Sequence, residues 1–183
     1  MTGDENGAAL ASAFRERSLV RVYHGGDRFD GRVIGLSEEL IAFAILNAGI
    51  RYDGLVVWRW QGLENVEAPH PHSAFYEAVL SSRRHNAPKP IRDLRGMAEL
   101  LRWARAAFSL VRIHPRADEP SVSHIGEVVD VSDETVTLRE IDADARFEAE
   151  TKEHRLGDIV RVDLGGAYEE ALALGSRLHR TNG

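Results

Sequence analysis

The chain contains no cysteine among its 183 residues, which excludes disulfide bonds, thiolate zinc sites and a cysteine nucleophile. It also has no apolar run close to the ~18 residues that a membrane helix needs. Residues 1–7 are polar and acidic, unlike the basic and apolar start of a secretory signal peptide. We therefore expect a soluble, cytoplasmic protein without membrane contact.

Signatures of catalysis and of metal binding are also missing. Gly35-Leu36-Ser37 lacks the closing glycine of a nucleophile elbow, and there is no phosphate-binding glycine loop and no zinc-binding helix with two histidines. We interpret His70-Pro71-His72 as a turn before a helix, because no third or fourth ligand is evident. Glu140, Asp142 and Asp144 lack the glycine and terminal glutamate of a calcium loop, which favours a solvated loop. The sequence predicts no enzyme activity, no metal site and no cofactor.

Charge is distributed unevenly around a net value of −6. Residues 83–115 carry 8 basic and 2 acidic side chains, whereas residues 116–175 carry 6 basic and 16 acidic ones. The basic segment can contact phosphates or can pair with the acidic segment that follows it, and we favour the pairing. Its candidate contact residues are Arg83, Arg84, Arg92 and Arg95.

Four segments of the first half recur, in the same order, in the second half. Residues 18–22 match 109–113, 31–39 match 126–134, 63–66 match 156–159, and 76–80 match 168–172. Because the order is kept and the gaps fall in predicted loops, we interpret the chain as an internal duplication. The expected domains are residues 1–85 and residues 86–183.

Each copy is predicted to contain a helix, five short strands and a second helix. Glycine inside a strand, as at Gly31, is typical of a bulge or bend that can close a small barrel. Apolar residues at steps of three and four from Ile91 to Phe108 predict an amphipathic helix between the copies. The expected strands are residues 19–22, 29–36, 40–46, 55–60 and 63–67, then 110–114, 126–131, 135–141, 149–155 and 159–163.

The first copy resembles the Sm-like family. Its residues Val20-Arg21-Val22, Gly26-Asp27, Phe29, Gly31, Val33, Gly35-Leu36 and Phe43 are similar to the first Sm motif. The resemblance implies a mainly β protein with flanking helices, in the α+β class, built as two tandem five-stranded Sm-like barrels. Each barrel would have an N-terminal and a C-terminal helix.

The resemblance does not extend to the residues with which Sm proteins read RNA. The family has an aspartate and an asparagine where this chain has Ser37 and Ile41, and Ser132 and Val136 in the second copy. Isoleucine and valine cannot form the hydrogen bonds of an amide with a base edge. We therefore expect the family's fold without its RNA recognition.

Trp58 and Trp60 lie two residues apart on a predicted strand and so share one face. With Tyr52 and Arg59 nearby, they can form a stacking surface for bases, or they can pack in the core, which we favour. The leading hypothesis is a non-enzymatic scaffold that binds a protein partner or forms a homo-oligomer. The alternative is a nucleic-acid-binding protein that uses the basic segment and this aromatic strand.

Overall fold

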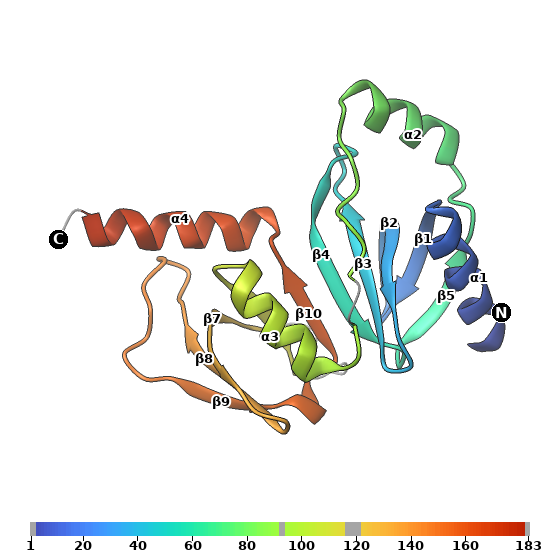
Figure 1. The fold of residues 1–183 in the computed structure, drawn as a ribbon. Coiled ribbons are helices and arrows are strands. Elements are labelled where there is room, and N and C mark those ends of the chain that lie inside the picture. The colour runs from blue at the N-terminus through green and yellow to red at the C-terminus, as the bar shows by residue number, and fades with distance from the viewer. Residues whose placement is uncertain (1–2, 92–93, 116–121, 182–183) are drawn as a thin grey trace. The chain divides into compact units, whose positions relative to one another are not determined.

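The computed structural model describes residues 3–91, 94–115 and 122–181 (Figure 1). The chain divides into two compact units, Met1–Leu94 and Arg95–Gly183, which we call unit 1 and unit 2. Over the described residues more of the regular structure is antiparallel β-sheet than helix, so the protein is mainly β. None of the helices in the described residues has the length and apolar character needed to span a membrane.

Unit 1 is a five-stranded antiparallel sheet with the strand order β5-β1-β2-β3-β4. The helix α1 packs on β2 and β5, where its Leu10 joins a core that contains Phe43 and Trp58. The elements are α1 (Gly3–Glu16), β1 (Leu19–His24), β2 (Asp27–Leu36), β3 (Leu40–Leu46), β4 (Tyr52–Arg59), β5 (Leu63–Glu67) and α2 (Ser73–Ser82).

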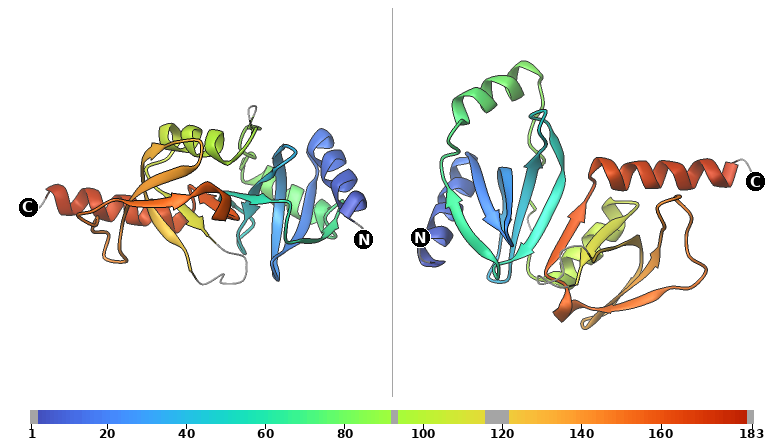
Figure 2. Two further views of the ribbon diagram at one scale, coloured as in Figure 1. Left: turned by 90° about the horizontal axis from the view of Figure 1, so that it is seen from below. Right: turned by 180° about the vertical axis from the view of Figure 1, so that it is seen from behind.

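Unit 2 is a second antiparallel sheet with the strand order β10-β6-β7-β8-β9. The helix α3 lies on one face of this sheet (Figure 2), against β7 and β8. The elements are α3 (Met97–Ala107), β6 (Val111–His114), β7 (His124–Val131), β8 (Thr135–Glu140), β9 (Lys152–Arg155), the 3₁₀ turn η1 (Leu156–Asp158), β10 (Arg161–Leu164) and α4 (Ala167–Thr181).

The predicted closed barrels are wrong, because the sheets are open. Within unit 1, β4 and β5 share no ladder in the described residues, and the same holds for β9 and β10 within unit 2. Closure requires the first and last strands of a sheet to meet. The glycine and the bulge that led us to expect a barrel bend β2 and β7, but bending one strand does not bring the outer strands together.

The linker helix is shorter than its apolar spacing predicts, because α3 begins only at Met97. Ile91 and Leu94 fit the helical period, yet both pack over Gly35 of unit 1. The backbone N–H of Ile91 donates to the carbonyl of Ile34, at 2.9 Å. These residues therefore complete unit 1, and the boundary between the units falls after Leu94.

The two sheets share one pairing register. In unit 1 Gly31 lies opposite Val20 and Ile45, and in unit 2 Gly126 lies opposite Val111 and Glu140. A bulge follows two residues later in both sheets, between Val33 and Gly35 and between Val128 and Asp130.

One of the four sequence matches has the wrong register. In unit 1, Val66 lies opposite Val22. The residue of unit 2 that matches Val22 is Ile113, which lies opposite Val162. Val66 therefore corresponds to Val162 and not to Ile159. The aligned residues 156–159 instead contain the 3₁₀ turn η1. Short apolar strands resemble one another, so the match shifted by three residues.

Substituting Gly31 or Gly126 with alanine is expected to destabilise the fold strongly. A Cβ atom at Gly31 would lie 2.0 Å from the carbonyl oxygen of Ala44, and one at Gly126 would lie 2.5 Å from that of Arg139. Overpacking of this kind costs ~1–3 kcal/mol or more. Thermal denaturation should show melting several degrees below wild type. Gly157→Ala is the control, because its Cβ would meet nothing within 4 Å; equal melting of all three variants would contradict this register.

Leu101→Ala should lower the melting temperature far more than Arg102→Ala. Leu101 is fully buried in α3, and truncating such a leucine costs ~2–5 kcal/mol. Arg102 is exposed and forms ion pairs with Glu99 and Asp133, which contribute only ~0–1 kcal/mol at a surface. Thermal melts of the two variants measure the difference, and equal losses would mean that α3 presents another face to the sheet.

Candidate functional site

Trp58 and Trp60, for which we weighed base stacking against packing in the core, belong to unit 1. Trp58 is completely buried, with its ring 5.1 Å from that of His24 and 4.9 Å from that of Phe29. Trp60 is half-buried, and its indole N–H donates to the carbonyl of Ser37 at 2.9 Å. The Trp58 ring therefore offers no open face on which a base could stack.

The other predicted contact residues of β4 are engaged within unit 1. Arg59 forms an ion pair with Glu39. The Tyr52 hydroxyl accepts a hydrogen bond from Arg32 Nε at 2.8 Å. These side chains therefore hold neighbouring parts of the sheet together.

Of the predicted basic residues, the structure describes Arg83, Arg84 and Arg95. Arg83 is exposed and donates to the carbonyl of Gly49, in the loop that precedes β4. Arg84 is exposed with a left-handed backbone, at φ 52°. Arg95 is exposed and belongs to unit 2, and Arg92 lies outside the described residues.

The basic face of α3 contacts acidic residues of its own unit. Arg102 is 2.6 Å from Asp133, and Arg105 is 3.8 Å from Asp130. These four side chains are exposed, so each pair contributes little to stability. Their arrangement nevertheless agrees with pairing between the basic and acidic segments.

A buried polar network in unit 1 joins Arg21, Asp30 and His70. Arg21 Nε lies 2.7 Å from Asp30 Oδ1, and His70 Nε2 lies 3.2 Å from the same oxygen. The backbone N–H of His72 donates to His70 Nδ1 at 3.0 Å, so the ring proton sits on Nε2 and is donated to Asp30. Burial lowers the pKa of His70, which keeps the ring neutral.

Asp30 itself remains ionised. Burial raises the pKa of this carboxyl group, but the hydrogen bond and the charge of Arg21, together with His70, outweigh burial and hold the pKa below its usual range. The side chain of His70 has no exposed surface, so it cannot reach a substrate. We therefore assign this network to the stability of unit 1.

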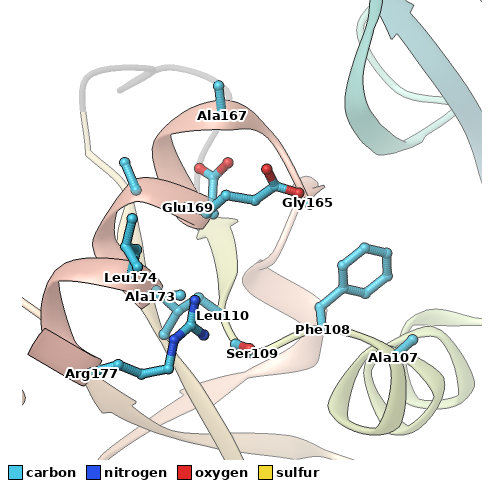
Figure 3. A pocket seen from close by; sticks show the side chains of 12 residues that line it. Ala107, Phe108, Ser109, Leu110, Gly165, Ala167, Glu169, Ala173, Leu174 and Arg177 are labelled. Carbon is cyan, nitrogen blue, oxygen red and sulfur yellow. The ribbon is translucent and has the colours of Figure 1, made fainter.

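A groove lined largely by apolar residues lies in unit 2, along α4. It has a volume of about 610 Å³ and is formed by residues 107–110, Gly165 and one side of α4. Figure 3 shows Phe108 on one side of this α4 groove and Leu174 and Arg177 of the helix on the other. Gly165 lies against the Phe108 ring, where a Cβ atom would approach to 2.7 Å.

The helix α4 is apolar on two faces. One face is buried and includes Leu172 and Ala173, which pack with Leu110, Ile141 and Ala145 in the core of unit 2. The other face is exposed: Leu174 is 52% exposed and Leu178 is 55% exposed. A surface helix normally carries polar side chains there. We call Ala171, Leu174 and Leu178 the α4 stripe.

Three metal-ligating side chains meet elsewhere in unit 2. His124 of β7, Glu140 of β8 and His154 of β9 bring one ligand atom each to within 4.8 Å of the others. We call them the His–Glu–His cluster. The sequence analysis missed it, because 15 and 13 residues separate its members in the chain, and Glu140 was assigned to a solvated loop although it is buried. The shared register of the two sheets is the signal that could have found it.

Comparisons with models of protein families, with curated proteins and with solved structures find no match to this chain.

Asp30→Asn should destabilise the protein at neutral pH, because Arg21 and His70 lose a buried carboxylate. Breaking one partner of a buried pair costs ~3–5 kcal/mol. The folded pKa of Asp30 is lowered, so its stabilising effect is present above the unfolded pKa of ~3.9 and is lost as the pH falls through the folded pKa. Melting curves of wild type and variant should thus converge in acid. Asp27→Asn, at an exposed position of the same strand, should melt like wild type; a gap that persists at low pH would contradict this assignment.

Proposed function

We propose that this protein is a non-enzymatic scaffold that self-associates through the α4 stripe of unit 2. The observation that carries the proposal is the exposed apolar face of α4. Leu172 and Ala173 pack in the core of unit 2, whereas Leu174 and Leu178 are exposed. Apolar surface of this kind is typical of an interaction site.

Charges beside the stripe favour a second copy of the chain as the occupant. Ala171, Leu174 and Leu178 recur at steps of three and four, as in the seam of a helix pair. Glu170 and Arg177 are exposed and flank this seam on one side, seven residues apart. When two copies of α4 pack antiparallel about Leu174, Glu170 of each helix meets Arg177 of the other. In a parallel pair, by contrast, Glu170 faces Gly175.

The expected assembly is reversible. The helix α4 has 15 residues, so a pair of these helices buries less area than the ~1,200–2,000 Å² of a stable interface. The chain carries a net charge of −6, so two copies repel each other at low salt. Exposed pairs such as Glu170 with Arg177 contribute only ~0–1 kcal/mol, so the main effect of salt should be to screen this repulsion and strengthen self-association.

Nucleic-acid binding, the alternative function, has less support. Trp58 is buried, and the basic side chains of α3 face acidic ones. The RNA-reading positions hold Ser37 and Ser132, and both hydroxyls accept hydrogen bonds from the backbone of their own turns. Binding to nucleic acid would weaken steeply with salt, the opposite of the trend expected here.

The duplication and the distant relation to Sm-like proteins are part of the same proposal. The common register of β1–β3 and β6–β8, with glycine and bulge at the same places, supports two copies of one unit. The order of helix, five strands and helix in each unit supports the family resemblance. A scaffold of two related units needs no catalytic residues.

Leu174→Asp should weaken self-association by about tenfold or more. Burying a leucine contributes ~1.5–3 kcal/mol, and each 1.4 kcal/mol corresponds to a factor of ten in affinity. Analytical ultracentrifugation over a wide concentration range measures the effect. Phe75→Asp is the control, because Phe75 is 61% exposed on α2 of unit 1 and should leave the association unchanged.

Charge reversal tests the antiparallel arrangement. Glu170→Arg alone should weaken the dimer, since it places arginine against Arg177 of the second copy. Adding Arg177→Glu should restore the dimer, because each new charge again meets its opposite. A wild-type chain that stays monomeric at every concentration and salt level would overturn the proposal, and so would a double variant that remains as weak as the single one.

A further inference from the structure

The His–Glu–His cluster occupies the buried side of the unit 2 sheet. Every second residue of β8 is buried, and these residues are Val136, Leu138 and Glu140. Their side chains therefore point to the same face of the sheet. The cross-strand partner of Glu140 is Gly126 of β7, which lies two residues from His124 on the same strand. The site is therefore formed by three neighbouring strands, which position side chains more rigidly than loops do.

One oxygen of Glu140 faces both imidazoles. Glu140 Oε1 lies 3.0 Å from His124 Nδ1 and 3.1 Å from His154 Nε2. Zinc bonds of ~2.0–2.2 Å in tetrahedral geometry place neighbouring ligand atoms roughly 3.4 Å apart. The two distances from Glu140 Oε1 need to lengthen by only a few tenths of an ångström to reach this spacing, and all three ligand atoms already lie within 4.8 Å of one another.

The other oxygen of Glu140 is held from outside the cluster. Lys152 Nζ lies 2.9 Å from Glu140 Oε2 and 2.9 Å from Glu148 Oε2. Lys152 thus fixes the orientation of the carboxylate and leaves Oε1 toward the histidines, as outer partners of metal ligands commonly do. Glu148 offsets the charge of the lysine, which would otherwise repel a cation.

The donor atoms of the cluster suit a transition-metal ion. Two imidazoles and one carboxylate form a donor set that transition metals prefer, whereas calcium and magnesium prefer oxygen alone.

Unit 1 shows what the same positions contain when no polar group is present. The register of each sheet identifies these positions. In unit 1, Ile45 lies opposite Gly31 and Trp58 lies opposite Ile41. In unit 2, Glu140 lies opposite Gly126 and His154 lies opposite Val136. The corresponding residues are Phe29 and His124, Ile45 and Glu140, and Trp58 and His154.

The two sets of side chains meet in the same way. The rings of Phe29 and Trp58 are 4.9 Å apart, and those of His124 and His154 are 4.5 Å apart. In unit 1 these residues belong to one apolar cluster. The matching positions of unit 2 hold three potential metal ligands in place of these apolar residues. Polar groups at a buried position are costly unless they are satisfied together.

We propose that His124, Glu140 and His154 bind one zinc-class divalent transition-metal ion, with water completing its coordination. His124 is 29% exposed at its side chain, which gives the ion and water access from solvent. The ion would join β9, a strand of four residues, to β7 and β8. The ion would thus hold these strands of unit 2 together, as aromatic packing does in unit 1.

Isothermal titration of the full chain with Zn²⁺, after removal of metal with a chelator, tests the proposal. We expect saturable binding of one ion per chain, a higher melting temperature with zinc, and a visible absorption band with Co²⁺ that reports tetrahedral coordination. Glu140→Gln keeps the shape of the side chain but removes its charge. It should reduce affinity by more than the ~10–100-fold that loss of an outer partner costs.

Two further variants make the result specific. Replacing all three residues by those of unit 1, as His124→Phe, Glu140→Ile and His154→Trp, should abolish zinc binding while melting stays cooperative. His179→Ala is the control, because His179 is an exposed histidine of α4 outside the cluster, and it should bind zinc like wild type. The proposal is overturned if wild type shows no saturable binding. It is also overturned if Glu140→Gln binds as tightly as wild type, or if His179→Ala loses as much affinity as Glu140→Gln.

Discussion

The close approach of two strands at a glycine is the constraint on which both sheets depend. At Gly31 and at Gly126 the neighbouring strand passes so near that its carbonyl oxygen occupies the place of a side chain. A shift of one residue would bring Arg32 or Glu127 to this point and would turn every buried side chain of the strand outward. The glycine therefore fixes the register, and the register fixes which residues form the core.

The bulge that follows each glycine extends this constraint to the next turn. After the bulge, the hydroxyls of Ser37 and Ser132 accept backbone hydrogen bonds from the residues that open the following strand. Both turns are thus held by the same contact. The same backbone then supports an apolar cluster in unit 1 and a polar one in unit 2. Burial alone stabilises the first, whereas the second requires that Lys152 and two histidines satisfy one carboxylate.

Local patterns in the sequence predicted the parts of this structure that depend on neighbours in the chain. Strand positions, the glycine register and the buried face of α3 follow from periodicity and turn residues. The start of α3 did not follow, because Ile91 and Leu94 fit a helical period but pack on Gly35. Whether a sheet closes depends on where its outer strands lie, which no local pattern records. The His–Glu–His cluster likewise depends on cross-strand pairing, and a comparison of the two sheets at matched register positions reveals it.

Under the proposed function, the helix α4 serves both its own unit and a second copy of the chain. Gly175 lies against Ala145, where a Cβ atom would approach to 2.7 Å, and His179 Nε2 lies 2.9 Å from the carbonyl oxygen of Asp144. These contacts hold the helix on the loop after β8, whereas Leu174 and Leu178 stay exposed. Because the inward face already supplies the core, we expect a change in the outward face to alter association at little cost to folding. The proposal thus places recognition and stability on two sides of one helix.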